Sequence, residues 1–285
     1  MTIEDFFTNQ LACWPEAAEN FRAAGESPVR HTGYAGMLTR LNARRTASTT
    51  AKTDTASVKA RPCFLCAANR PAVQTADHRF EGYELLVNPF PIFSRHFTIA
   101  ATGHVSQSLQ HRGAHMWAMA REMAGYAVFY NGPRCGASAP DHAHFQAVPA
   151  AELPFVSQGF PFATISFEAT DPRQAETLLT QALRQAATLP GQPAGAEPMV
   201  NILAVAADTE PQPDTDAATT VRFIVIPRRA HRPRLYGTMP GQMLVSPATI
   251  DLAGVMVTVR PDDFEALSPE LVKEILDEVC YPSGQ

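Results

Sequence analysis

The chain has 285 residues, a formal net charge of −5 and a pI near 6.0, so it lacks the positive charge that non-specific nucleic-acid binding requires. With 45% hydrophobic and 18% charged residues it can bury a core, and no stretch approaches the roughly 20 apolar residues of a membrane span. Acidic residues stand where a secretion signal would carry Lys or Arg, and five cysteines are an odd number, so we expect reduced thiols in a cytoplasmic protein.

The N-terminal part is expected to be helical over the first forty-odd residues, because Phe6, Phe7 and Trp14 can share one helix face. Residues 46–60 are small and polar without an apolar period, which favours an exposed loop. We therefore predict that residues 1–60 are a helical extension followed by a polar loop.

Short β-rich runs broken by Pro and Gly predict the strands that follow. They cover residues 83–91, 96–102, 126–131 and 142–150. Ser106 stands where it can cap a helix over residues 107–123, although Gly113 weakens that helix.

The second part of the chain repeats this rhythm loosely. Strands are predicted over residues 163–169, 201–208 and 221–227, helices over 171–187 and 268–280, and a turn or protruding loop over 207–220. The runs HFTIAATGHVSQ and VRFIVIPRRAHRP each place a histidine after a strand and a turn. This pattern favours an α+β fold of two related halves that share an antiparallel sheet.

The run HAHFQ places His142, His144 and Gln146 at alternate positions. Because side chains alternate in direction along a strand, the three would project from one face, with Ala143 and Phe145 turned toward a core. A solvated polar strand face is the alternative interpretation. A row of imidazole and amide groups above a small-residue loop instead favours a functional site.

That loop, NGPRCGASA, contains Asn131, Gly136 and Ser138 and has little side-chain bulk. Its backbone amides can approach phosphate oxygens closely. A neutral imidazole beside such a cradle can attack phosphorus and carry a nucleotidyl group covalently, and a glutamine amide can donate to the phosphate without adding a competing charge.

Two further groups are candidate ligands. Cys63 and Cys66 have the spacing of a zinc knuckle, with a redox pair or two buried cysteines as alternatives.

A basic turn contains Arg228 and Arg232, whose planar guanidinium groups suit phosphate, with a solvated basic loop as the alternative. The sequence has no Gly-x-x-x-x-Gly-Lys-Ser/Thr loop, which disfavours a P-loop kinase or ATPase.

The run GASAPDHAHFQ resembles the active-site motif of the histidine-triad superfamily in its transferase branch, which carries His-x-His-x-Gln. This branch includes galactose-1-phosphate uridylyltransferases, diadenosine tetraphosphate phosphorylases and GDP-L-galactose phosphorylases. The resemblance implies that His144 is the nucleophile and that Gln146 assists it. The segment NPFP is similar to the Asn-x-Phe-Pro segment beside the nucleotide in this branch, which makes Asn88 and Phe90 candidates for binding ribose and base.

The same resemblance implies a structural Zn²⁺ ion. Its ligands in the family are a Cys-x-x-Cys pair, a histidine after a strand and turn, and the first histidine of the motif. These map onto Cys63, Cys66, His104 and His142. Four protein ligands leave no open position for substrate.

The resemblance further implies the domain organisation. It predicts a HIT-like antiparallel sheet with helices packed on it, a catalytic half over residues 61–150 and a second, degenerate HIT-like half over residues 151–285. In the uridylyltransferases, subunits pair to complete their sites, which implies a homodimer.

The implied reaction is a double displacement. His144 attacks the α-phosphorus of a nucleoside diphosphate sugar or a dinucleoside polyphosphate, and a phosphate-bearing acceptor then takes the nucleotidyl group. Because the attacking imidazole must be neutral, activity is expected to fall below about pH 6.5. Hydrolysis and a non-catalytic nucleotide-binding module are the alternatives. Glutamine in the third motif position favours transfer.

Overall fold

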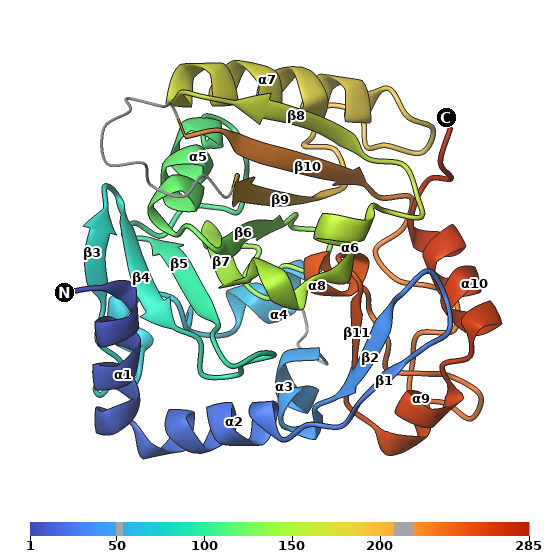
Figure 1. Ribbon diagram of the computed structural model, residues 1–285, viewed down its shortest axis with the longest axis horizontal. Helices are drawn as coiled ribbons and strands as arrows, with labels where there is room; N and C mark the ends of the chain where they lie inside the picture. Colours follow the sequence, from blue (N-terminus) through green and yellow to red (C-terminus); the bar gives the residue numbers. More distant parts are fainter. Residues whose placement is uncertain (50–53, 208–218, 285) are drawn as a thin grey trace.

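The protein is described here from a computed structural model that covers residues 1–49, 54–207 and 219–284. Its central element is a large antiparallel sheet (Figure 1). In spatial order the eight strands of this sheet, within those ranges, are β3 (Asp77–Phe80), β4 (Tyr83–Val87), β5 (Phe97–Ala101), β7 (His144–Pro149), β6 (Tyr126–Asn131), β9 (Val200–Ala206), β10 (Val221–Pro227) and β8 (Ile165–Ala169). All neighbouring strands are antiparallel. The predicted α+β fold with an antiparallel sheet is thereby confirmed.

Helices cover one face of this sheet. They are α1 (Ile3–Cys13), α2 (Pro15–Gly25), α5 (Gly113–Glu122) and α7 (Pro172–Ala187). Alternate strand residues, such as Ile99 on β5 and Phe145 on β7, point into the apolar cluster beneath these helices. Because α7 has Asp171 as its N-cap and an apolar stripe that includes Leu179, its sequence specifies both where it begins and which face it buries.

The opposite face of the sheet is covered in two separate patches. Over β6, β9 and β10 lies a second apolar cluster built from C-terminal elements, and over β4 and β5 lies a third cluster with Cys63 and Leu65. The elements on this side are η3 (Ala150–Glu152), α6 (Pro154–Gln158), α8 (Thr249–Leu252), α9 (Pro261–Ala266), α10 (Pro269–Val279), η2 (Ala67–Asn69) and a small sheet of β1 (Val29–His31), β2 (Leu38–Leu41) and β11 (Val255–Thr258). The part of the face between the two patches remains open to a cavity.

The N-terminal prediction was wrong beyond Gly25. Residues 29–41 contain β1 and β2, because β2 pairs with β11, a strand more than two hundred residues away, and local sequence carries no trace of that partner. Residues 46–60 were predicted as a loop, yet their described part contains α3 (Thr46–Thr49) and α4 (Thr55–Lys59), which follow η1 (Ala43–Arg45). Asp54 caps α4 by accepting the Ser57 N–H at 3.0 Å.

The helix predicted from residue 107 begins only at Gly113. Gln107 and Leu109 hydrogen-bond to other segments, and the first amides of α5 donate to Glu176 on α7 instead of to a local cap. A Cβ atom at Gly113 would lie 2.9 Å from the Glu176 Cα atom. The glycine that weakens the helix in isolation is therefore what lets α5 and α7 approach.

Several predictions are not tested by the fold. The strand pairing of β6 with β9 carries the sheet across residue 150, while the assignment of 1–60, 61–150 and 151–285 as separate units stays a prediction. Most of the loop predicted over 207–220 lies outside the described residues. Across the described ranges, no helix has the length and apolarity needed to cross a membrane. The cytoplasmic location and the homodimer stay predictions.

Candidate active site

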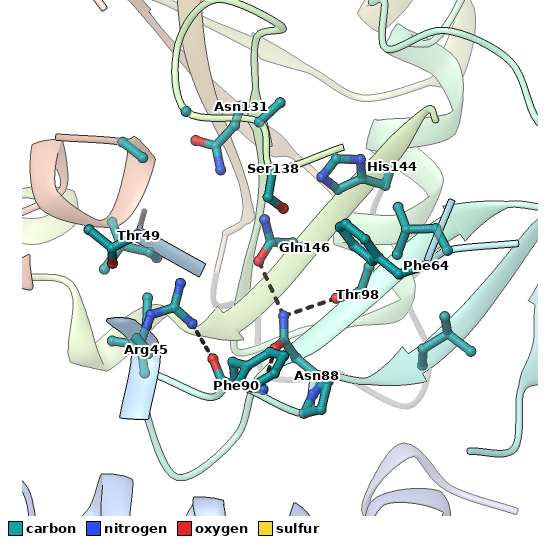
Figure 2. A pocket seen from close by; sticks show the side chains of 18 of the residues that line it. Arg45, Thr49, Phe64, Asn88, Phe90, Thr98, Asn131, Ser138, His144 and Gln146 are labelled. Atoms are coloured by element: carbon teal, nitrogen blue, oxygen red, sulfur yellow. Dashed lines mark hydrogen bonds between the residues drawn. The ribbon is translucent and has the colours of Figure 1, made fainter. Parts of the chain in front are cut away.

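A cavity of about 520 Å³ opens on the part of the sheet face that the two patches leave uncovered (Figure 2). It is walled by the carboxyl end of β4, by β5 and β7, by the loop after β6, and by segments from both ends of the chain. The predicted site residues that line it are Asn88, Phe90, Asn131, Gly136, Ser138, His144, Gln146 and Arg232. Residues far apart in sequence thus meet at one cavity.

The alternation predicted for the HAHFQ run is present in β7. His144 and Gln146 line the cavity, whereas Ala143 and Phe145 lie in the apolar cluster on the other face. His142 precedes the strand and contributes to a separate group with Cys63 and Cys66. The motif therefore serves two neighbouring sites.

The His144 ring has a defined tautomer. Its Nδ1 atom lies 2.8 Å from the carbonyl oxygen of His142, and a carbonyl oxygen can only accept a hydrogen bond. In the neutral ring, Nδ1 therefore carries the proton and Nε2 keeps its lone pair. Burial lowers the pKa of His144 to about 4, below the reference value of about 6.5 on which the expected loss of activity in acid was based. A neutral imidazole with a free Nε2 is a competent nucleophile.

Gln107 holds the backbone of His144, a contact that sequence reasoning missed. Its side-chain oxygen accepts the His144 N–H at 2.8 Å, and its amide nitrogen lies 3.0 Å from the carbonyl oxygens of both His144 and Asn131. Gln107 is buried and bridges the point where β6 and β7 stop pairing directly. The run HVSQ has no property that reveals this role, since the partners are assembled only by the fold.

Asn131 presents its amide group to the cavity. Its Oδ1 atom accepts from Asn201 Nδ2 at 2.8 Å, from the Thr249 N–H at 3.0 Å and from the Thr249 hydroxyl at 2.7 Å. With the oxygen side saturated, the Nδ2 donors are left for the cavity that Asn131 lines (Figure 2).

The loop after Asn131 has a backbone conformation at position 136 that requires a glycine. Gly136 has φ +98°, a region that favours glycine, and a Cβ atom there would lie 2.7 Å from the Ala248 Cβ atom. Within the described chain, the N–H groups of Gly136 and Ser138 have no protein acceptor. Such amides at a cavity wall are available to an anion.

Asn88 and Phe90 occupy the opposite wall of the cavity. The Asn88 side chain accepts the Phe90 N–H at 2.9 Å and donates to the Thr98 hydroxyl at 3.0 Å, so it shapes the turn after β4 (Figure 2). Phe90 is 41% exposed, which is high for a large apolar side chain. Arg45 donates to the Phe90 carbonyl oxygen and adds a cation to this end of the cavity.

The two predicted arginines have different environments. Arg228 is fully buried and donates to Asn201 Oδ1 at 2.6 Å and to the carbonyl oxygens of Pro247 and Val279. It is absent from the cavity lining, so its assignment as a phosphate ligand was wrong, because a run of basic residues does not reveal which one the fold buries. Arg232 does line the cavity.

The Arg232 side chain is held on both sides. Its guanidinium carbon lies 4.0 Å from the centroid of the Tyr236 ring, and its Nε donates to the Ser246 hydroxyl at 3.1 Å. The terminal nitrogens are left to form the paired hydrogen bonds that arginine makes to phosphate. His231, with a pKa lowered to about 4 mainly by burial, adds a neutral ring beside it.

Next to the cavity, four side chains form a group that could hold a metal ion. The ligand atoms of Cys63, Cys66, His104 and His142 all lie within 4.8 Å of one another. His142 Nδ1 is 3.3 Å from Cys63 Sγ and 3.6 Å from Cys66 Sγ, and His104 Nδ1 is 3.3 Å from Cys66 Sγ. Atoms bound at roughly 2.0–2.3 Å to a tetrahedral zinc ion lie roughly 3.3–3.8 Å apart, so these three distances agree with such an ion.

The surroundings of this group also suit metal binding. His142 Nε2 lies 2.8 Å from the Ala101 carbonyl oxygen, so Nε2 carries the proton and the Nδ1 lone pair faces the thiols. On the other histidine, His104 Nε2 is 3.8 Å from the Asp141 carboxylate. The hydrogen bond from His142 to Ala101 is of the kind that orients ligating histidines.

Comparison with known proteins places the geometry in context. A family model described as "Domain of unknown function (DUF4922)" matches residues 6–149, and no curated protein sequence matches the chain. Yeast Ap4A phosphorylase Apa2 has a similar structure, with 15% identity, a TM-score of 0.60, and coverage of 95% of this chain and 97% of Apa2. Its complexes with AMP and with Ap4A give 17% and 16% identity and TM-scores of 0.57 and 0.56, over 96% and 95% of this chain and 98% of Apa2. At 15–17% identity this likeness shows the fold alone, and it agrees with the predicted α+β fold built on an antiparallel sheet.

Proposed function

Because this chain belongs to the DUF4922 family, whose description assigns no function, its reaction has to be argued from the site, and we propose a nucleotidyltransferase or phosphorylase that works by double displacement. The observation that carries the proposal is the His144 ring, which is buried, neutral and protonated on Nδ1, with Nε2 left at a cavity lined by amide donors. The similarity in fold to yeast Ap4A phosphorylase Apa2 supports the proposal.

In the first step, the lone pair of His144 Nε2 attacks the α-phosphorus of the donor nucleotide. The bond from that phosphorus to the bridging oxygen breaks, and its electrons leave with the phosphate-bearing product. In the second step, an oxygen of a phosphate-bearing acceptor attacks the same phosphorus, and the histidine departs as the neutral ring. Atoms and charge balance without any oxidant or reductant.

Negative charge grows on the two non-bridging oxygens as His144 attacks. We assign to these oxygens the donors that line the same cavity, which are the side-chain amides of Asn131 and Gln146 and the backbone N–H groups of Gly136 and Ser138. None of these donors needs to move a proton, so they can serve both steps alike.

The remaining cavity residues suggest how the two ends of the substrate lie. We assign Asn88 and Phe90 to the ribose and base of the transferred nucleotide. Arg232, which also lines the cavity, is assigned to a phosphate of the leaving group or acceptor. A dinucleoside polyphosphate and a nucleoside diphosphate sugar both fit this order of parts. The AMP and Ap4A complexes of Apa2 support a nucleotide donor.

Hydrolysis and non-catalytic binding are the competing functions. Hydrolysis would need an activated water, and Gln146 supplies no base at the third motif position. A binding module would have no requirement for a neutral ring with a free Nε2 behind the phosphate loop. Transfer to a phosphate-bearing acceptor therefore agrees best with the residues present.

We also propose that the four-residue group holds a structural Zn²⁺ ion, with Cys63, Cys66, His104 and His142 as ligands. Bound there, the ion would supply a cross-link between the Cys-x-x-Cys turn and the residue that precedes β7. It takes no part in either chemical step, since its four ligands leave no position for substrate.

The proposed function is tested by intact-protein mass spectrometry. Wild type and a His144→Asn variant are mixed with a panel of nucleotide sugars and dinucleoside polyphosphates and quenched under mildly basic conditions that preserve phosphohistidine. A wild-type mass increase equal to one nucleoside monophosphate, absent from the variant, is expected and identifies the base. Nucleotide binding without an adduct from any donor would instead favour the non-catalytic module.

A further inference from the structure

His96 lies behind the cavity wall and forms one side of the environment of Gln146. It is fully buried and absent from the cavity lining, so it cannot touch a substrate. Its Nε2 atom lies 2.9 Å from Gln146 Oε1, and its Nδ1 atom lies 3.2 Å from the Ile92 nitrogen. Both ring nitrogens of His96 are thus committed to protein partners.

These contacts fix the tautomer of the His96 ring. The Ile92 nitrogen belongs to a backbone N–H, which can only donate, so His96 Nδ1 must accept and carries no proton. In a neutral ring the proton is then on Nε2, which donates to Gln146. Burial supports the neutral ring, since it lowers the pKa of His96 to about 3.

The tautomer in turn fixes the amide of Gln146. An N–H donor at His96 Nε2 requires the oxygen of the Gln146 amide, and the Asn88 amide nitrogen, 3.5 Å from that oxygen, favours the same orientation (Figure 2). The nitrogen of Gln146 is left on the cavity side, with two N–H groups to donate. In the reversed orientation an amide oxygen would face the phosphate and two N–H groups would meet the donors of His96 and Asn88.

We propose that His96 is a positioning residue that sets the orientation of the Gln146 amide, so that its N–H groups face the transferring phosphate. The inference rests on the proposed function for its effect on rate, while the relay Ile92 to His96 to Gln146 is a property of the structure alone. It gives the NPFPIFSRH segment a second task, because the turn that carries Asn88 and Phe90 also carries the residue that orients Gln146 from behind.

Two substitutions separate the donor of His96 from its acceptor. His96→Asn can keep an acceptor near the Nδ1 position for the Ile92 N–H but has no group that reaches Gln146. His96→Gln can place an amide N–H near the Nε2 position and keep the donor to Gln146. If His96 had only a structural role, the two variants would form the adduct at equal rates, or His96→Asn would be the faster of the two.

The rate of nucleotidyl-histidine formation is expected to fall about 10-fold or more in His96→Asn and to stay within about 3-fold of wild type in His96→Gln, because a misdirected donor loses part of the effect of an oxyanion-type contact. Nucleotide Kd should change less than about 3-fold in both, since Gln146 acts mainly as charge builds. A Leu179→Ala variant on α7 serves as a control for lost stability, with the rate unchanged below its melting temperature.

A double-mutant cycle adds the decisive comparison. In a Gln146→Ala background, His96→Asn should change the rate less than about 2-fold, because the residue through which it acts is gone. A full loss in that background, or a His96→Asn variant as fast as wild type, overturns the proposal.

The tautomer itself is read from ¹⁵N chemical shifts of labelled histidine, with His96 assigned from the variants. A proton on Nε2 is expected, and a proton on Nδ1 overturns the relay. Because this readout needs no turnover, it stands apart from the adduct experiment. Failure of the proposed function would leave the adduct absent with the Nε2–H tautomer intact.

Discussion

The backbone carbonyl oxygen of His142 accepts the Nδ1–H of His144 at 2.8 Å, while the ring of the same His142 faces the thiols of Cys63 and Cys66. One residue therefore belongs to the candidate metal group through its side chain and orients the proposed nucleophile through its main chain. His142 thus links the candidate metal group to His144 through one backbone hydrogen bond.

Metal removal is the first prediction that follows. Purified protein should contain zinc, and a Cys66→Ser variant should lose zinc, melt at a lower temperature and form the nucleotidyl adduct at least about 10-fold more slowly, because His142 is no longer fixed. Elemental analysis, thermal unfolding and the adduct rate measure the three effects. A Cys13→Ser variant, which alters an exposed cysteine, is the matched control. Full activity in zinc-free Cys66→Ser protein would contradict the coupling.

Gln107→Leu should slow adduct formation about 10-fold or more, because it removes the hydrogen bonds that hold the His144 backbone and leaves buried polar groups unpaired. Its unfolding free energy should fall by about 1–3 kcal/mol for the same reason. The exposed neighbour Gln110→Leu is the control and should change neither quantity. Single-turnover kinetics and chemical denaturation make the measurement, and equal effects of both variants would argue against the role of Gln107.

Gly136→Ala and Gly125→Ala form a matched pair. Both positions have positive φ, so each alanine should cost about 1–2 kcal/mol of unfolding free energy through backbone strain. Only Gly136 adds a contact, with the Ala248 Cβ atom at 2.7 Å, and only Gly136 lines the cavity. We expect Gly136→Ala alone to lower kcat, measured in steady state below the melting temperature. Equal loss of kcat in both variants would show that the loop after Asn131 has no specific role in the reaction.

Arg232→Gln should raise the KM of the phosphate-bearing acceptor about 10-fold, which corresponds to the loss of one charge-assisted phosphate contact. Formation of the adduct in the first step should change less, if Arg232 mainly binds the acceptor. The control is Arg234→Gln, whose side chain is 87% exposed and pairs with Glu278. Comparable KM values for the two variants would show that Arg232 does not contact the phosphate-bearing acceptor.

The placement of His144 and Gln146 on one face of β7 could be predicted from sequence because it depends on neighbours at alternate positions. His144 and Gln146 need only a strand to share a face, and the apolar Phe145 between them indicates which face is buried. Gln107 and His96 could not be found in this way. Their roles are hydrogen bonds to segments tens of residues away, and neither has an unusual neighbour in sequence.

The same distinction explains the errors in the fold. The α7 helix carries its cap and apolar stripe within its own sequence and begins where predicted. Strands β1, β2 and β11 are short, and their pairing joins segments near the two ends of the chain. No hydrophobic period in the local sequence therefore predicted them. Arg228 was misassigned for a related reason: its burial depends on Val279 and Pro247, which close over it only in the folded chain.

The pairing of β6 with β9 has a consequence for synthesis on the ribosome. A nascent chain that has reached residue 150 already contains His144 and Gln146, yet the edge of β6 that faces β9 is still unpaired and Asn201 has not been made. The oxygen of Asn131 then has no amide partner to saturate it, and the loop after Asn131 does not yet have Ala248 beside Gly136. Such long-range strand pairing forms late and slowly. Catalytic competence should thus appear only when the C-terminal strands have been translated and docked. A truncated chain should be inactive and should expose an unpaired strand edge that favours aggregation.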